Sequence, residues 1–227
     1  MKRIPEPELM NEVETVAAYA GSSLDNGHWL FLQNFRKYFR GFQPKGAILD
    51  LGCGPAAITL RLAVLFPQCE VHGIDGAHSM LEFGKKAIRR EGLENRVRLF
   101  HGILPHKINL PRKRYEAVVS NSFLHHLADP QTLWNAVLSY SLPGAAVLVV
   151  DLLRPNSPAS AEFIVDTYVP NAPPLLRKDM LLSLQAAYTF EEVEEHLQQA
   201  GLSERLTLAM ASPFQFAAYG YVNINNI

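Results

Sequence analysis

The sequence predicts an α/β fold, in which a doubly wound, mostly parallel sheet is closed by an antiparallel C-terminal hairpin. From position 47 onward, short β-branched or aliphatic runs alternate with stretches that carry apolar residues at helical spacing. This alternation is typical of repeated βαβ units. Two apolar runs near the C-terminus are separated only by Ala211, Ser212 and Pro213, which indicates a hairpin.

A seven-stranded sheet follows from these runs. The parallel strands are expected at 47–51, 70–74, 97–101, 117–120 and 145–151, and the hairpin strands at 204–210 and 214–222. Their apolar density suits strands that helices cover on both faces. No internal repeat, low-complexity tract or linker divides the sequence, so one domain is expected.

Helices are expected between the strands and on both sides of them in the sequence. The helical patterns cover 56–66, 78–91 and 131–140, with two N-terminal helices at 8–20 and 28–39 and an apolar helix around 175–187. A proline-rich stretch from 154 to 174 precedes that last helix. Thr189 with Glu192 three residues later is a capping-box pattern that begins one more helix, and Gly201 ends it.

Composition and charge exclude several classes of protein. The chain is 48% apolar and 19% charged, and 21 basic against 22 acidic residues leave a net charge of -1. Because affinity for nucleic acid comes largely from Lys and Arg on phosphate, a nucleic-acid partner is not expected. Cys53 and Cys69 lack the short spacing of closed metal sites, so we expect reduced thiols in a cytoplasmic protein. The longest wholly apolar run, 145–150, is too short to span a membrane, and neither export nor a membrane partner is expected.

The segment from 48 to 57 leads from a strand through a Gly-x-Gly turn into a helix. Gly52 and Gly54 allow a sharp bend and a close approach of a ligand to the backbone, although the pattern alone also fits a turn without a ligand. Asp75 ends the next strand, one βαβ step later, where a carboxylate can accept hydrogen bonds from both hydroxyls of a ribose. The pattern therefore predicts a cofactor that contains a nucleoside.

Asp50, two residues before the first glycine, distinguishes between such cofactors. A carboxylate beside the turn disfavours a pyrophosphate, whereas it attracts an ammonium group in a partly desolvated site. Ala57 is compatible with either kind of cofactor. The sequence thus favours a nucleoside cofactor that carries an ammonium group over one that carries a pyrophosphate.

The sequence resembles the class I, Rossmann-like S-adenosylmethionine-dependent methyltransferases from about residue 47 to 222. Motif I of this family is matched by LDLGCGP at 49–55, followed by GIDGAHSML at 73–81, YEAVVSNSFLHHL at 115–127 and LPGA at 142–145. The resemblance implies S-adenosylmethionine as the cofactor and S-adenosylhomocysteine as the product. It places cofactor contacts at Asp50, Gly52, Cys53, Gly54, Asp75, Gly76, Met80, Gly102, Ile103 and Asn121.

By this likeness, Asp50, Gly52 and Gly54 surround the methionine moiety, Asp75 holds the ribose, and Gly76 and Met80 line the adenine. The family often carries an acidic residue after the third strand, whereas His101 and Gly102 are followed here by Ile103. Contacts to adenine at this point are therefore expected to be apolar or to come from the backbone.

The same likeness divides the domain into a helical cap at 1–45, a cofactor-binding core at 46–153, a candidate substrate lid at 154–188 and a C-terminal helix and hairpin at 189–227. The lid segment lies where this fold usually builds the cover over the acceptor. Candidate acceptor contacts are Tyr19, Asp151, Arg154 and Tyr168, although Asp151 and Arg154 also fit a simple ion pair.

Methyl transfer from a sulfonium is an in-line displacement, for which positioning is the main requirement and a base is optional. His125 follows the fourth strand at the ligand-binding edge of the sheet and is the candidate catalytic base. The other histidines show no i, i+4 pairing with an intervening glutamate, so no metal is expected.

These observations predict an S-adenosylmethionine-dependent methyltransferase that acts on a small molecule. The exposed edge of the hairpin and the N-terminal helices could support a homodimer. An Asn/Asp-Pro-Pro-aromatic tetrad is missing after the fourth strand, which argues against methylation of nucleobase amines. One alternative is an NAD(P)-dependent oxidoreductase that uses the same turn, although the sequence lacks a Tyr-x-x-x-Lys pair. The other is a non-catalytic, methyltransferase-like module that binds cofactor.

Overall fold

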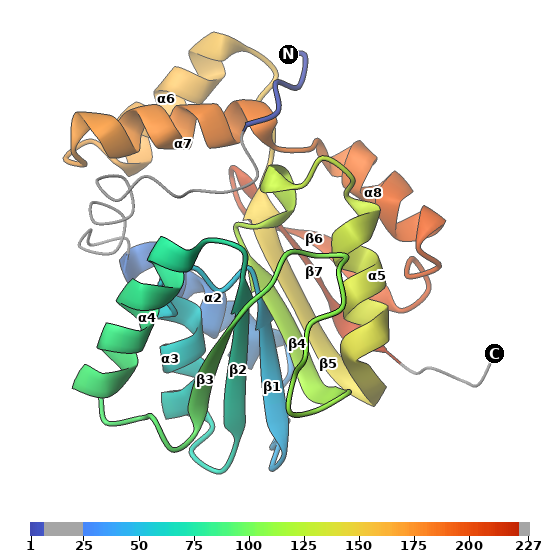
Figure 1. The fold of residues 1–227 in the computed structure, drawn as a ribbon. Helices are drawn as coiled ribbons and strands as arrows, with labels where there is room; N and C mark the ends of the chain where they lie inside the picture. Colours follow the sequence, from blue (N-terminus) through green and yellow to red (C-terminus); the bar gives the residue numbers. More distant parts are fainter. Residues whose placement is uncertain (7–24, 223–227) are drawn as a thin grey trace.

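The computed structural model, which describes residues 1–6 and 25–222, contains one sheet with helices on both faces (Figure 1). The sheet has seven strands in the order β3-β2-β1-β4-β5-β7-β6. The parallel strands are β1 (Ala47–Leu51), β2 (Glu70–Asp75), β3 (Val97–His101), β4 (Tyr115–Asn121) and β5 (Ser141–Leu152). The hairpin of β6 (Leu206–Ser212) and β7 (Gln215–Val222) runs antiparallel. The predicted fold class is confirmed.

Two apolar cores lie on opposite faces of the sheet. Helices α2 (Asp25–Tyr38), α3 (Ala57–Leu65) and α4 (His78–Arg90) supply one of them, and α5 (Gln131–Tyr140) and α8 (Phe190–Gln199) supply the other. Neighbouring strand residues divide between the two cores because successive side chains point to opposite faces; Ile48 belongs to one and Leu49 to the other. Both side chains are fully buried.

Helix α8, which precedes the C-terminal hairpin, begins and ends as the sequence predicts. The Thr189 side chain accepts a hydrogen bond from the backbone N–H of Glu192, whose own side chain accepts one from Thr189 N–H. Gly201 follows with a φ of 66°, the left-handed conformation that ends many helices. The thiols of Cys53 and Cys69 are buried and form no disulfide, as expected.

The proline-rich stretch contains a helix that the sequence reading missed, α6 (Pro158–Tyr168), which precedes α7 (Pro174–Ala186). Ser157 caps α6 by accepting a hydrogen bond from Ser160 N–H, and Pro158 occupies the first turn, where a missing N–H costs nothing. Helices α6 and α7 lie side by side beyond the carboxyl ends of β4 and β5 (Figure 1). The predicted helix at 8–20 and the candidate acceptor contact Tyr19 fall outside the described residues.

The strand order reverses between β1 and β4, since β2 and β3 follow on one side of β1 while β4 and β5 follow on the other. Parallel sheets of this type bind ligands outside the carboxyl ends of the strands at such a reversal. The glycine turn after β1 and the loop after β4 meet at this position. Within the described ranges, no helix is long and apolar enough to cross a membrane.

Candidate functional site

The glycine turn after β1 combines close packing with an open backbone. Gly52, Gly54 and Ala56 have φ values of 69°, 51° and 69°. A Cβ on Gly52 would lie 2.3 Å from Cγ of Phe123, so only glycine fits beneath that ring. A Cβ on Gly54 would meet no atom within 4 Å. The backbone at Gly54 is therefore open to a ligand, as a cofactor cradle requires.

Asp75 joins the end of β2 to this turn. Its Oδ2 accepts a hydrogen bond of 2.8 Å from Gly54 N–H, and its Oδ1 accepts one of 2.8 Å from Ala77 N–H. Each oxygen of a carboxylate has further acceptor capacity, so these bonds orient the group without exhausting it. Burial raises the pKa of Asp75, and the two backbone donors oppose that rise. The carboxylate is placed to accept hydroxyl groups of a ligand beside Gly54.

Asp50 lies inside the turn, where its side chain is almost completely buried. Thr59 Oγ1 donates a hydrogen bond of 2.6 Å to Asp50 Oδ2. Burial raises the pKa of Asp50 to about 7, with a smaller contribution from Asp75 and partial opposition from Thr59. Near neutral pH, the charge of this carboxyl group is therefore sensitive to any cation that approaches it.

Cys53, a predicted cofactor contact, mainly supports the turn. Its N–H donates to Ile74 O at 2.9 Å, and its carbonyl accepts a hydrogen bond from Ala56 N–H at 3.0 Å. The thiol packs against Gly73, where a Cβ would lie 2.7 Å from the sulfur. The side chain thus fills space under β2.

The ends of β2 and β3 bring together the residues that were expected around adenine. Met80 is buried in a small apolar cluster with Ala77 and Phe83. Gly102 N–H donates to Asp75 O at 3.0 Å, and Ile103 is 40% exposed. The backbone of Gly102, which Ile103 follows, therefore lies beside Asp75 in space although the two are far apart in the chain.

Two histidines at this edge were not identified from the sequence. The rings of His78 and His101 stack with centroids 3.7 Å apart, and His101 Nε2 lies 3.1 Å from the carbonyl oxygen of Gly76. They come from α4 and β3, so no local spacing could indicate the pair. Their aromatic surface borders the predicted adenine region.

The loop after β4 begins at Asn121 and continues into the short 3-10 helix η1 (Leu124–His126). Asn121 lies at the carboxyl end of β4, where its Nδ2 donates to Ser122 Oγ at 3.3 Å. Ser122 has a φ of 53°, and this left-handed residue turns the chain so that Phe123 covers Gly52. The loop and the glycine turn are therefore one packed unit.

Asp151 organises this loop from the end of β5. Its buried carboxylate accepts hydrogen bonds from the N–H groups of Phe123, Leu124 and Leu152 at 2.8, 2.6 and 2.7 Å. The expected pairing of Asp151 with Arg154 is wrong. Arg154 instead donates to Glu192 Oε1 at 2.7 Å and to the carbonyl of Ala187 at 3.0 Å. Both side chains are thus engaged in hydrogen bonds within the protein.

His125, the candidate base, lies in η1 with its side chain 3% exposed. Its Nδ1 is 2.5 Å from Asp151 Oδ1, and its Nε2 is 3.3 Å from Glu6 Oε1. Burial disfavours the imidazolium ion, but Asp151 and Glu6 outweigh this effect and raise the pKa of His125. Both ring nitrogens are engaged, so the imidazole cannot take a proton from an acceptor unless Glu6 moves away.

The candidate lid consists of α6, α7 and the chain that joins them. Tyr168, at the end of α6, is 46% exposed, and its ring centroid lies 4.5 Å from that of Phe214. Helix α7 contacts η1, and the N-terminal segment reaches the same place. There, Arg3 stacks over Tyr188 at 4.1 Å and donates to the carbonyls of His125 and Leu127.

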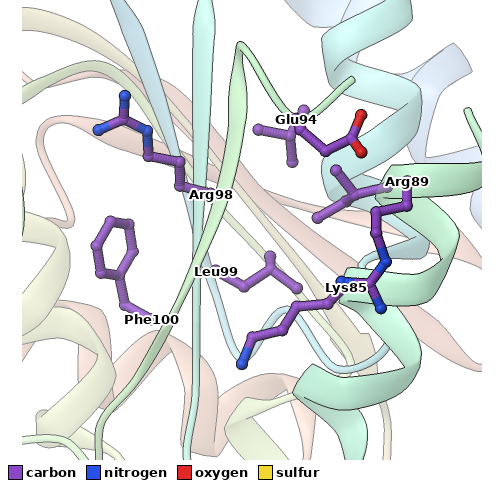
Figure 2. A pocket seen from close by; sticks show the side chains of 8 residues that line it. Lys85, Arg89, Glu94, Arg98, Leu99 and Phe100 are labelled. Carbon is purple, nitrogen blue, oxygen red and sulfur yellow. The ribbon is translucent and has the colours of Figure 1, made fainter. Parts of the chain in front are cut away.

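A surface cavity of about 340 Å³ lies elsewhere, between α4 and β3 (Figure 2). Its labelled lining residues are Lys85, Arg89, Glu94, Arg98, Leu99 and Phe100. None of these residues belongs to the glycine turn or to the loop after β4. The cavity is therefore separate from the candidate site.

The part of the chain that carries this site is similar to known proteins. Residues 48–144, which include the glycine turn, Asp75 and the loop after β4, match the family model described as a methyltransferase domain. The release factor glutamine methyltransferase of Thermosynechococcus vestitus is 30% identical over 118 residues, which is 52% of this chain and 34% of that protein. The malonyl-[acyl-carrier protein] O-methyltransferase of Priestia megaterium is 28% identical over 121 residues, 53% of this chain and 41% of that protein.

The chain thus spans well under half the length of these curated relatives. Among solved structures, the plantazolicin methyltransferase in complex with S-adenosylhomocysteine and a triazolic analogue has the same fold. Its TM-score is 0.70 at 14% identity, over 92% of this chain and 90% of that one. In strand order, in the order of its motifs and in the matched residues 48–144, the chain is similar to the class I S-adenosylmethionine-dependent methyltransferases.

Proposed function

We propose that the protein transfers a methyl group from S-adenosylmethionine to a small-molecule acceptor. The observation that carries this proposal is the open backbone at Gly54, held 2.8 Å from the carboxylate of Asp75. Together they offer a cradle for an amino-acid end and an acceptor for ribose hydroxyls at the carboxyl edge of the sheet. When bound, S-adenosylmethionine supplies an electrophilic methyl group on its sulfonium sulfur.

Different residues around the cradle would bind different parts of the cofactor. Asp50 and the backbone of Gly52 and Gly54 would hold the methionine moiety, and Asp75 would hold the ribose. The adenine would lie among Gly76, Met80, Gly102 and Ile103, and Asn121 would line the sulfonium side. Positioning of the acceptor and exclusion of water by the lid can supply about 7–11 kcal/mol of the barrier, so no base is required.

His125 has a positioning role in this proposal. Its ring links Asp151 with Glu6, and this keeps the loop after β4 packed against the glycine turn. A catalytic role as a base would require the N-terminal segment to leave, because Glu6 lies at Nε2.

A small-molecule acceptor is supported by the near-neutral charge and by the helical cover of α6 and α7 over the edge of the sheet. The relatives' names point to different acceptors: one is a release factor glutamine methyltransferase and the other methylates a malonyl group on a carrier protein. The acceptor class is thus argued from this chain alone.

Calorimetry of the full chain with S-adenosylmethionine, S-adenosylhomocysteine and NADH tests which cofactor binds. Incubation with S-adenosylmethionine and pools of metabolites, followed by detection of S-adenosylhomocysteine, tests whether a methyl group is transferred. We expect both sulfur nucleosides to bind, NADH not to bind, and some pool to support turnover. Binding of NADH without either nucleoside would favour the oxidoreductase alternative. Binding without turnover on any pool would favour the non-catalytic module.

Cofactor binding at about pH 6 is expected to release a proton from Asp50, whose pKa in the unliganded protein is about 7. An ammonium group beside the carboxyl favours the ionised form and lowers its pKa on binding. Affinity for S-adenosylhomocysteine should therefore rise as the pH increases towards 7. Calorimetry in two buffers of different ionisation enthalpy measures the proton release directly.

Asp50→Asn should abolish this release, while the exposed control Glu82→Gln should keep it. Equal proton release in wild type and Asp50→Asn would show that Asp50 does not face the ammonium group.

A further inference from the structure

Two histidines and one carboxylate converge between the N-terminal segment and η1. Glu6 Oε1 lies 3.3 Å from His125 Nε2 and 3.2 Å from His126 Nδ1. All three atoms lie within 4.8 Å of one another. The side chains of Glu6, His125 and His126 are 7%, 3% and 16% exposed. This cluster is therefore enclosed by protein.

The two distances from Glu6 are close to those between ligands of one tetrahedral metal ion. Zn²⁺ binds imidazole nitrogen and carboxylate oxygen at about 2.0–2.2 Å, so two of its ligands lie roughly 3.3–3.5 Å apart. The distances from Glu6 Oε1 to the two imidazole nitrogens, 3.3 and 3.2 Å, lie at and just below the lower end of this range. Two imidazoles and one carboxylate suit zinc and similar transition metals, whereas Mg²⁺ prefers oxygen ligands throughout.

The surroundings of the cluster also resemble those of a metal site. A histidine that binds metal usually donates its other ring N–H to a carboxylate, which fixes the ring and the tautomer. Asp151 Oδ1 lies 2.5 Å from His125 Nδ1 and is itself held by backbone N–H groups. Ser183 Oγ donates to Glu6 Oε1 at 3.1 Å. Ser183 thus orients the carboxylate of Glu6, and Asp151 orients the ring of His125.

The negative charges around His125 favour a cation that carries more than one positive charge. The carboxylates of Asp151, Glu6 and Asp179 all act on this buried imidazole. A protonated imidazole would balance only one of these negative charges. The guanidinium of Arg3 donates to the backbone carbonyls of His125, Leu127 and Ala186. A divalent ion would balance the cluster more completely.

We propose that Glu6, His125 and His126 bind one divalent transition-metal ion, with Zn²⁺ as the preferred ion. Three protein ligands leave the fourth tetrahedral position for a water molecule. The ion would fasten the N-terminal segment to η1 and so to the loop after β4. The expectation of no metal rested on Cys and His spacings in the sequence and did not weigh Glu6 together with His125 and His126. The proposal is independent of methyl transfer.

The test uses the full chain after removal of metal with EDTA and dialysis, titrated with Zn²⁺ and separately with Mg²⁺. We expect one Zn²⁺ per chain, no Mg²⁺ binding and a higher melting temperature with Zn²⁺. Glu6→Gln and His126→Asn should each weaken Zn²⁺ binding by at least about tenfold. The exposed control His106→Asn should bind like wild type.

A second pair of histidines supplies the decisive comparison. If binding survives in Glu6→Gln and His126→Asn but disappears in His78→Asn, the ion belongs to the stacked His78 and His101 rings and the proposal is overturned. Failure of the folded wild type to bind Zn²⁺ would overturn it as well, leaving an imidazolium–carboxylate ion pair. Should either ligand variant fail to fold, visible spectra of Co²⁺ bound to the wild type report whether nitrogen and oxygen ligands surround the ion.

Discussion

Asp151→Ala is expected to destabilise the metal-free protein by about 3–5 kcal/mol, the usual cost of removing one partner of a buried ion pair. The substitution leaves the N–H groups of Phe123, Leu124 and Leu152 and the ring of His125 without their acceptor. Urea unfolding in EDTA at about pH 5–6 measures the loss, since EDTA removes any contribution from bound metal.

The effect should depend on pH in a defined way. Burial opposes ionisation of Asp151, but His125 outweighs it and lowers the pKa below 3.8, so this contribution is lost as the pH falls through the lowered value. The pKa of His125 is raised above 6.5, so its contribution is lost as the pH rises through the raised value. The loss caused by Asp151→Ala should therefore be largest between about pH 4 and 6.5.

Two further variants serve as controls for Asp151→Ala. Asp151→Asn keeps one acceptor oxygen and should lose less stability than the alanine variant. Asp166→Ala removes a 66% exposed carboxylate from α6 and should change stability by less than about 1 kcal/mol. A loss of less than 1 kcal/mol for Asp151→Ala, with an unchanged urea dependence, would contradict the organising role of Asp151.

The parts of the fold that could be predicted from sequence depend on interactions between residues close in the chain. The capping box of Thr189 and Glu192 spans one helical turn, and the glycine turn uses the conformations of a few successive residues. The same local reasoning failed at α6, where prolines suggested a loop. Ser157 and Pro158 instead form a helix start, in which proline precedes the positions that need N–H donors.

The candidate site shows the limit of local reasoning more clearly. Asp151 and Arg154 are neighbours in sequence, but Asp151 turns toward η1 while Arg154 is fixed beside α8 by Glu192. Glu6 meets His125 only because the N-terminal segment packs against α7 and η1. Such contacts depend on the packing of elements that are distant in the sequence. The spacing of residues therefore could not predict the partners of Asp151 and Arg154 or the contact of Glu6 with His125.

Gly54→Ala is expected to weaken binding of S-adenosylhomocysteine by about 1–3 kcal/mol, which corresponds to roughly 5- to 150-fold in Kd. A Cβ at this position meets no protein atom within 4 Å, so it projects into the space that the ligand needs. Since φ is 51°, an alanine also carries a strain of about 1–2 kcal/mol in the folded protein.

Gly92→Ala separates the strain from the loss of ligand space. Gly92 has a φ of 66°, its added Cβ likewise meets no atom within 4 Å, and it lies just beyond the opposite end of α4 from the glycine turn. Both variants should lose similar stability in thermal unfolding, because each places a side chain in the left-handed region. Only Gly54→Ala should lose affinity in calorimetry. Equal affinities for the two variants would show that the ligand does not approach the backbone at Gly54, and the cradle would then have to be sought elsewhere along the edge of the sheet.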